Sequence, residues 1–438
     1  MSSKQYYYIE TYGCQMNVYD SELVARMLSE SNYLEAETPE SADIIFINTC
    51  SVREGAETRV MNRLDYMKGL KKKKNSLVIG VIGCMAQNLK DDILESKPFV
   101  NFVLGPDSYS KLPVLLESQK PWEIREAHTD LSKYETYEHI YPLRSEGINA
   151  MVAIMRGCDK MCTFCIVPYT RGRERSKSAA AVVEEVKSAA EQGFKEVTLL
   201  GQNVNSYNDS VVNFPELLRR VAKVDGIRRI RFTSPHPQDA TDELIDVMAG
   251  HENICNHIHL PLQSGSNRVL KRMNRSYTRE KYLELTMKFR NRIPGVAITT
   301  DIIVGFCGET DEEFEETLDL MNKVRFDSAF TFKYSERPYT AAYKKMKDDV
   351  SGEVKGERIV RLIETQKKIT LENNRELIGS TLEVQIEKES KKSDEHYISR
   401  TETNRLVVLP KNGKVPGDFL DVTITDAAGI TLFGEPAF

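Results

Sequence analysis

Apolar runs alternate with segments of helical length over the first 120 residues. Three of these runs predict buried strands, at residues 6–10, 43–48 and 77–83. Helical spacing of the apolar positions predicts helices between them, at residues 21–30 and 57–68. Strands that are apolar on both faces and alternate with helices are typical of a parallel sheet covered on both sides. We therefore expect an α/β domain over residues 1–120.

A second, longer alternation begins at residue 148. Its predicted strands lie at 149–155, 196–200, 228–233, 255–260, 297–304 and 328–334. Its predicted helices lie at about 178–192, 214–223, 241–250, 279–291 and 311–323. A full eight-unit barrel needs about 250 residues, so these six units predict a partial (βα)6 barrel. An amphipathic helix over 356–376 leads out of it.

The end of the chain has a different pattern. Short alternating runs broken by Gly, Pro and Asn predict a small all-β barrel of the OB-like kind over residues 377–438. The polar stretch 121–147 is interpreted as a linker. The expected organisation is thus an α/β domain (1–120), a linker (121–147), a partial barrel (148–376) and a β module (377–438).

Composition narrows the class of protein. The chain has 438 residues and a formal net charge of −5, which argues against binding nucleic acid through overall charge alone. No apolar run approaches the roughly 18 residues of a membrane span, so we expect a cytoplasmic protein without membrane contact. Eight cysteines in a long intracellular chain favour metal binding or catalysis over disulfides.

Three cysteines follow the first strand of the predicted barrel, with the spacing Cys158-x3-Cys162-x2-Cys165. Thiolates are the usual ligands of iron–sulfur clusters, and three of them hold three irons of a 4Fe–4S cube. The fourth iron then stays open for a small chelating ligand, a role that suits the amino and carboxylate groups of S-adenosylmethionine. The alternative is a zinc site, which usually needs four ligands. No fourth ligand is apparent nearby in the sequence.

Three further cysteines, Cys14, Cys50 and Cys84, each follow one strand of the first domain. Their spacings of 36 and 34 residues correspond to about one strand–helix unit each. Ligands of open α/β sheets bind beyond the carboxyl ends of the strands, so the three thiols are predicted to converge on one ligand. The alternative is that they are three small buried apolar residues.

Polar side chains at other strand ends are candidates for contact with S-adenosylmethionine or with an adenosine substrate. They are Gln202, Asn203, Asn205, Gln263, Ser264 and Asp301. Hydrogen bonding to loop backbone is the alternative for each. Arg171, Arg173 and Arg175 are candidates for the cofactor carboxylate or for phosphates, or are solvated charges. His257 and His259 share a strand face and are expected to be satisfied core residues, and Cys255 and Cys307 to be inert.

Several motifs carry a family resemblance. The segments CTFCIVPYTRGRERS, LLGQNVNSY, RFTSPHP and HLPLQSGS, with the upstream cysteines and the final β module, resemble the methylthiotransferases of the radical S-adenosylmethionine superfamily. The resemblance is greatest to the branch that adds a methylthio group at C2 of N6-(dimethylallyl)adenosine at position 37 of tRNA. Related branches act on threonylcarbamoyl-adenosine in tRNA or on a ribosomal protein, and these stay open as alternatives.

The resemblance implies two 4Fe–4S clusters, one of which binds S-adenosylmethionine and one, auxiliary, is held by Cys14, Cys50 and Cys84. It also implies a final RNA-binding TRAM module and an electron donor such as flavodoxin or ferredoxin. Large apolar surface stripes are not evident in the sequence, so we expect a monomer. The module has 7 basic and 10 acidic residues, so a local patch at Lys391, Lys392, Arg400 and Arg405 or the barrel's own arginines must meet phosphate. A non-catalytic iron–sulfur protein that binds RNA is the alternative from another class.

Three residues depart from the family pattern. Cys307 stands where the resemblance implies proline, and Tyr339 and Ser399 stand where it implies glycine. None of the three is among the six proposed cluster ligands.

Overall fold

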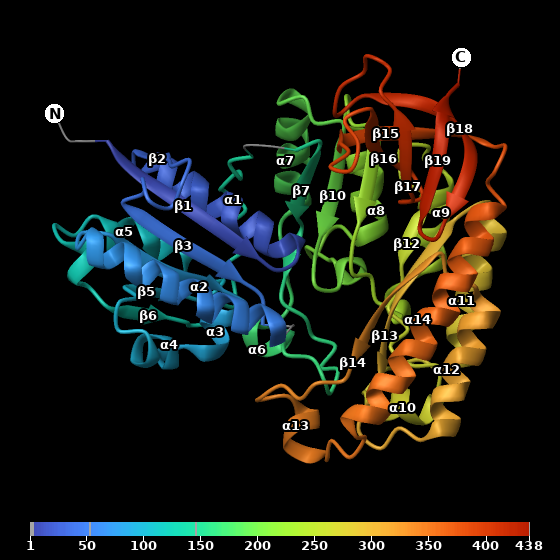
Figure 1. Cartoon of the computed structure of the whole chain (residues 1–438), viewed down its shortest axis with the longest axis horizontal. Coiled ribbons are helices and arrows are strands. Elements are labelled where there is room, and N and C mark those ends of the chain that lie inside the picture. Colours follow the sequence, from blue (N-terminus) through green and yellow to red (C-terminus); the bar gives the residue numbers. More distant parts are fainter. Residues whose placement is uncertain (1–3, 52–53, 145–146, 438) are drawn as a thin grey trace.

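The computed structural model describes residues 4–51, 54–144 and 147–437 (Figure 1). Three bodies follow one another along the chain: a parallel sheet with helices on both faces, an open barrel, and a small closed barrel at the C-terminal end. No described helix is long and apolar enough to cross a membrane.

The first body is a six-stranded sheet in the order β2-β1-β3-β4-β5-β6, and every neighbouring pair is parallel. Its strands are β1 (Gln5–Tyr12), β2 (Tyr33–Glu35), β3 (Ile44–Thr49), β4 (Val78–Gly83), β5 (Phe102–Leu104) and β6 (Glu126–His128). The helices are α1 (Gln15–Glu30), α2 (Glu54–Lys73), α3 (Cys84–Leu89), α4 (Asp91–Ser96) and α5 (Leu112–Leu116). β3 and β4 are buried along their whole length, as their apolar sequences predict.

The two faces of this sheet have separate apolar clusters. One includes Tyr19 and Leu23 of α1, and the other includes Leu64 and Met67 of α2. The expected α/β domain is therefore confirmed. Its sheet also extends into the stretch predicted as a linker, because β6 pairs with β5.

The second body is the predicted partial barrel, built as two three-stranded parallel halves. Its strands are β7 (Asn149–Ala153), β10 (Glu196–Leu200), β11 (Arg229–Phe232), β12 (His257–His259), β13 (Ala297–Val304) and β14 (Ser328–Lys333). The main helices are α7 (Ala179–Glu191), α8 (Phe214–Ala222), α9 (Asp242–Ala249), α11 (Arg279–Arg292), α12 (Asp311–Val324) and α14 (Gly352–Arg375). A single bridge between Ile230 and Ile254 joins the halves.

Five smaller elements lie in the connections that follow β7, β12 and β14. They are the antiparallel strands β8 (Met155–Arg156) and β9 (Arg175–Ser176) and the short helices α6 (Val167–Arg171), α10 (Asn267–Arg272) and α13 (Ala341–Lys345). The loop with Cys158, Cys162 and Cys165 runs from β8 to α6.

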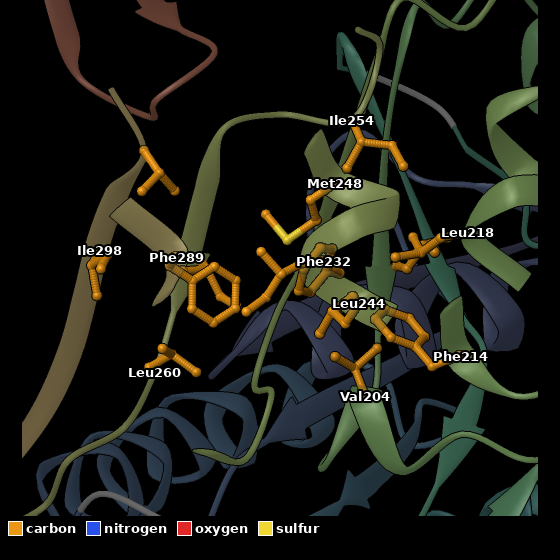
Figure 2. Close-up of a cluster of buried hydrophobic side chains, with 14 of the residues drawn as sticks. Val204, Phe214, Leu218, Phe232, Leu244, Met248, Ile254, Leu260, Phe289 and Ile298 are labelled. Carbon is orange, nitrogen blue, oxygen red and sulfur yellow. The ribbon is translucent and has the colours of Figure 1, made fainter. Parts of the chain in front are cut away.

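Alternation along the barrel strands separates a core face from an inner face. On β13, Ile298 and Ile302 belong to the large apolar cluster beneath the helices, whereas Thr299 and Asp301 lie on the opposite face. Figure 2 shows part of this cluster, to which Phe289 of α11 also contributes. The polar inner face of the barrel strands is therefore the face that can carry a functional site.

The third body is a closed five-stranded barrel in the order β15-β16-β17-β19-β18. Its strands are β15 (Thr381–Glu389), β16 (His396–Thr401), β17 (Leu406–Pro410), β18 (Phe419–Ala428) and β19 (Thr431–Pro436). This confirms the predicted small all-β module. Val384, Val407 and Leu432 are fully buried inside it.

Arginines join this module to the partial barrel. Arg231 donates to the carbonyls of Thr401 (2.8 Å) and Glu402 (2.7 Å), and Arg229 donates to the carbonyl of Arg400 (2.8 Å). Both belong to the barrel's own arginines, which the sequence offered for contact with phosphate, and the structure instead buries them in a contact between two parts of the chain.

Arg400 and Arg405 of the module are also engaged within the protein. Arg400 pairs with Glu387, and Arg405 pairs with Asp327 of the barrel. Of the proposed basic patch, Lys391 and Lys392 remain as exposed charges.

Candidate metal centres and their surroundings

Cys14, Cys50 and Cys84 lie at the carboxyl ends of three adjacent parallel strands. Cys14 follows β1, Cys50 follows β3 and Cys84 follows β4 as the first residue of α3. The order β1-β3-β4 places these strand ends side by side. Gly13 allows the end of β1 to lie close to Cys50, because a Cβ at this position would lie only 2.9 Å from the Cβ of Cys50.

The charge around these thiols favours thiolates. A hydrogen bond from Cys50 and the guanidinium of Arg171 together outweigh burial and lower the pKa of Cys14 to about 6. Burial raises the pKa of Cys84, and Arg171 opposes that shift. The Nε of Arg171 donates to the Sγ of Cys84 at 3.2 Å.

Arg171 also joins the two larger bodies of the chain. It pairs with Asp20 of α1 at 2.8 Å, and Arg156 of β8 pairs with the same carboxylate at 2.7 Å. All three side chains are almost fully buried. Burial raises the pKa of Asp20, but the two guanidinium groups outweigh it and hold that pKa below its ordinary value. The loop that ends in α6 is therefore anchored to the first domain.

The second set of cysteines lies in that loop. The amide of Cys158 donates to the carbonyl of Gly172 (3.1 Å), and the amide of Cys165 donates to that of Cys162 (3.0 Å). Burial raises the pKa of Cys158 to about 11 and that of Cys165 to about 12, and the charge of Cys162 adds to both shifts. The three thiols are thus close enough to interact.

One half-buried arginine also donates to this set of cysteines. Arg275 donates from Nη1 to the Sγ of Cys162 at 3.3 Å and is held by the carbonyl of Pro261 (2.9 Å) and by Tyr277 (2.9 Å). Each set of cysteines therefore has one guanidinium that donates to one sulfur.

The donor chemistry fits iron–sulfur clusters better than zinc. Each set consists of three thiols, whereas a zinc site usually needs four ligands. Three thiolates can hold three irons of a 4Fe–4S cube. N–H donors to the sulfurs are typical of such sites.

Comparison with known proteins agrees with this geometry. The Radical SAM superfamily profile matches residues 152–321, the profile of uncharacterized protein family UPF0004 matches 6–105, and the TRAM domain profile matches 375–437. A tRNA-2-methylthio-N(6)-dimethylallyladenosine synthase of Chloroherpeton thalassium is 50% identical over 430 residues, covering 98% of this chain and 95% of the relative. The enzyme of that name from Porphyromonas gingivalis is 50% identical over 437 residues, covering 98% and 94%. The chain belongs to the radical SAM methylthiotransferase family.

A solved structure shows the same fold at lower similarity. The radical S-adenosylmethionine methyltransferase TsrM of Kitasatospora setae superimposes with a TM-score of 0.59 at 14% identity, covering 78% of this methylthiotransferase and 77% of TsrM. The likeness supports the arrangement of the first sheet and the partial barrel.

Two of the predicted cofactor-binding residues contact the cysteine loop of the methylthiotransferase or its neighbours. Gln202 accepts a hydrogen bond from the amide of Gly157 at 2.5 Å, next to Cys158. Asn203 donates to Asp239 at 2.8 Å, and its buried Oδ1 has no hydrogen-bond partner among the described residues. An acceptor left unpaired in this way is suited to a ligand donor. Both residues stay predictions as cofactor contacts.

The remaining predicted contact residues differ from one another in burial and in hydrogen-bond or ion-pair partners. Ser264 is fully buried against Thr317, with 3.4 Å between their hydroxyl oxygens. Asp301 pairs with His259 at 3.3 Å, and its backbone carbonyl accepts from Gln263 at 2.8 Å. Arg173 is largely exposed and pairs with Asp159 at 2.6 Å, beside Cys158. Asp301 and Arg173 present charge near the site, whereas Ser264 is enclosed.

The two histidines are hydrogen-bonded, as expected, but they are only partly buried and so are not core residues. His257 and His259 share the hydroxyl of Thr299, at 3.1 Å and 2.9 Å, on the inner face of the barrel. Burial holds the pKa of His257 well below its ordinary value, so that ring is neutral. Cys255 and Cys307 are buried, and their inertness stays a prediction.

Sequence reasoning missed the residues that support the cysteines. Arg171 was a candidate for phosphate or the cofactor carboxylate, and the structure buries it with 3% of its side chain exposed. Asp20, Arg156 and Arg275 were not singled out. Their partners lie between 113 and 151 residues away along the chain, and no local spacing signals such contacts.

Proposed function

We propose that this methylthiotransferase adds a methylthio group at C2 of N6-(dimethylallyl)adenosine at position 37 of tRNA. The name carried by relatives that are 50% identical over nearly the whole chain supports this substrate. The TRAM profile supports RNA as the partner. The observation that carries the proposal is the pair of cysteine sets, each with a donating arginine.

We further propose two 4Fe–4S clusters. Cys158, Cys162 and Cys165 would hold the cluster that binds S-adenosylmethionine, and Cys14, Cys50 and Cys84 would hold an auxiliary cluster. Bound together, cluster and S-adenosylmethionine supply the one-electron cleavage that starts radical chemistry. The Asp20–Arg171 and Asp20–Arg156 pairs support a fixed relation between the sets, because they link α1 to both ends of the cysteine loop.

The chain's own residues orient and enclose the reactants. Gln202 holds Gly157 and so shapes the loop at Cys158. A Cβ at Gly157 would lie 2.0 Å from the carbonyl of Arg173, so only glycine permits this loop path. Asn203, Gln263 and Asp301 are proposed to contact S-adenosylmethionine or the adenosine, with Arg173 near the cofactor carboxylate.

The proposed division of labour follows the three bodies. Residues 1–120 would hold the auxiliary cluster, and residues 121–147 would link them to the barrel. Residues 148–376 would carry the radical chemistry, and residues 377–438 would bind RNA. A flavodoxin or ferredoxin would supply electrons to a monomeric enzyme. Its tRNA substrate supports the cytoplasm as its place of action.

The test is turnover of the anaerobically reconstituted, reduced protein with S-adenosylmethionine and isopentenylated tRNA. Nucleoside mass spectrometry should show the methylthio mass gain, together with deoxyadenosine. The same assay with threonylcarbamoylated tRNA and with ribosomal protein should give no product.

The remaining outcomes separate the alternatives. Deoxyadenosine without the tRNA product would overturn the substrate and keep the enzyme class. Two intact clusters with neither product would favour a non-catalytic iron–sulfur protein that binds RNA.

A further inference from the structure

We propose that a surface around α13 receives unstacked bases and phosphates of the tRNA anticodon loop, with Tyr339 as a stacking residue. This inference rests on the proposed function, because it names where that tRNA would bind. The α13 surface is defined by Tyr169, Tyr339, Tyr343, Lys344, Lys345 and Lys347.

Three exposed tyrosines gather on this surface. Tyr339 is 51% exposed, Tyr343 50% and Tyr169 41%. An exposed ring offers a face on which any unpaired base can stack. Single-stranded loops are the part of RNA that proteins recognise in this way.

Basic side chains lie between these rings. Residues 333–347 contain five basic residues and one acidic residue, Glu336, in a chain whose net charge is −5. Lys344, Lys345 and Lys347 are exposed, and none forms an ion pair within the described part of the chain. The neighbouring carboxylates have partners: Asp348 pairs with Lys355, and Asp349 accepts from the amide of Gly308. These lysines are therefore available for phosphate.

Tyr339 has a backbone conformation that its side chain disfavours. Its φ is +73°, in the left-handed region that favours glycine, and glycine is the residue that the family pattern implies here. The next residue fixes the turn, because Thr340 donates to the carbonyl of Arg337 (2.8 Å) and accepts from the amide of Tyr343 (3.3 Å). A strained, exposed aromatic residue on a fixed turn is typical of a binding site.

The α13 surface adjoins the loop of the proposed radical cluster. The amide of Ala342 in α13 donates to the carbonyl of Thr163, the residue after Cys162, at 2.8 Å. The ammonium group of Lys344 lies 5.8 Å from the ring centroid of Tyr169 in α6. Figure 1 shows α13 at the foot of the molecule, with α6 above it. Bases held here would lie beside the cluster loop.

Three arginines of the barrel and the β module are less able to serve this role. Arg229, Arg231 and Arg405 are used between the barrel and the β module. An acidic electron-donor protein would also match the lysines. The interleaved exposed tyrosines favour RNA, since stacking on bases uses ring faces that a charged protein surface does not need.

The test measures binding of isopentenylated tRNA to the reconstituted full-length enzyme by fluorescence anisotropy at several salt concentrations. Tyr339→Gly should weaken binding by about fivefold or more without lowering the melting temperature, because glycine adopts this φ without strain. Tyr339→Phe keeps the ring and should bind like the unchanged enzyme. Tyr134→Ala, at an 86% exposed tyrosine in the linker, is the matched control.

The lysines are tested by salt dependence. Lys344→Gln combined with Lys345→Gln should reduce the slope of log K against log salt by about 1.4, or about 0.7 for each lost phosphate contact. An unchanged slope and an unchanged affinity of Tyr339→Gly, with tight binding by the unchanged enzyme, would overturn this inference and leave the proposed function standing. Absence of tRNA binding by the unchanged enzyme would overturn both.

A second measurement distinguishes binding of an electron donor at the α13 surface from binding of RNA. If the variants bind tRNA normally but form deoxyadenosine slowly with flavodoxin and at the normal rate with dithionite, the surface serves the electron donor and the inference is wrong. Equal deoxyadenosine rates with both reductants, together with weakened tRNA binding, support it.

Discussion

The guanidinium of Arg171 touches the Sγ of Cys84 through Nε at 3.2 Å and the carboxylate of Asp20 through Nη2 at 2.8 Å. One buried side chain thus links a proposed cluster ligand of the first domain to a loop of the barrel. A charge-assisted bond of this kind holds geometry as well as charge.

Substitution of Arg171 is expected to alter the auxiliary cluster selectively. In Arg171→Met, loss of the N–H···S bond and of the positive charge disfavours the more negative reduced state. The potential of that cluster should fall by at least about 60 mV, a tenfold change in a one-electron equilibrium. Redox titration followed by EPR measures it.

The matched control for this prediction is Arg275→Met, which removes the donor to Cys162 instead. It should shift the potential of the S-adenosylmethionine cluster and leave the auxiliary one unchanged. Equal shifts of both clusters in both variants would show that the arginines act only through general stability.

Removing each set of cysteines is expected to separate the two clusters. Ala at Cys14, Cys50 and Cys84 should leave one cluster and retain deoxyadenosine formation while abolishing methylthiolation. Ala at Cys158, Cys162 and Cys165 should abolish both. Iron and sulfide content, with product analysis, provides the measurement.

Cys255→Ala and Cys307→Ala are the controls for the cysteine variants, because both residues are buried and neither belongs to the two sets. Each should keep the full iron content. Loss of one cluster in either variant would contradict the proposed assignment of ligands.

The raised pKa of Glu22 in α1 predicts that the stability of the protein depends on pH. Burial raises its pKa to about 7, Arg144 opposes the shift and Glu185 adds to it. Since the folded pKa lies above the unfolded one, the ionised carboxylate costs stability, and this cost grows from about pH 4.5 to pH 7. Glu22→Gln should therefore stabilise the protein at pH 8, by up to about 3 kcal/mol, and have little effect at pH 4.5.

Thermal unfolding at the two pH values tests this expectation. Glu95→Gln, at an exposed glutamate of α4, is the control and should show no such pH dependence. A stabilisation by Glu22→Gln that is equal at both pH values would show that the carboxylate is not the cause.

Arg231 is expected to hold the β module on the barrel. Arg231→Ala removes its bonds to the carbonyls of Thr401 and Glu402 and its ion pair with Glu196. Breaking a buried pair typically costs about 3–5 kcal/mol, so limited proteolysis near residue 378 should become faster. Arg219→Ala, at an exposed pair on α8, should not change the cleavage rate.

The sequence predicted the elements and the cysteines because both signals are local. β10 and β13 occupy the predicted residues 196–200 and 297–304, and the five runs of the β module became its five strands. Periodicity reports burial within one element, and Cys158-x3-Cys162-x2-Cys165 lies within one loop. The strand-end placement of Cys14, Cys50 and Cys84 follows from the parallel sheet that the apolar runs predict.

Only the tertiary structure decided what the arginines do. Arg171, Arg229 and Arg231 are indistinguishable from solvated or RNA-binding charges in the sequence, yet each is buried against a partner far along the chain. The same holds for β6, whose pairing with β5 has no local signal in a polar stretch. The physical reason is that no periodicity in the sequence indicates which residue a charged side chain will pair with. Whether an arginine meets solvent, phosphate or a buried carboxylate is set by which surfaces the fold brings together.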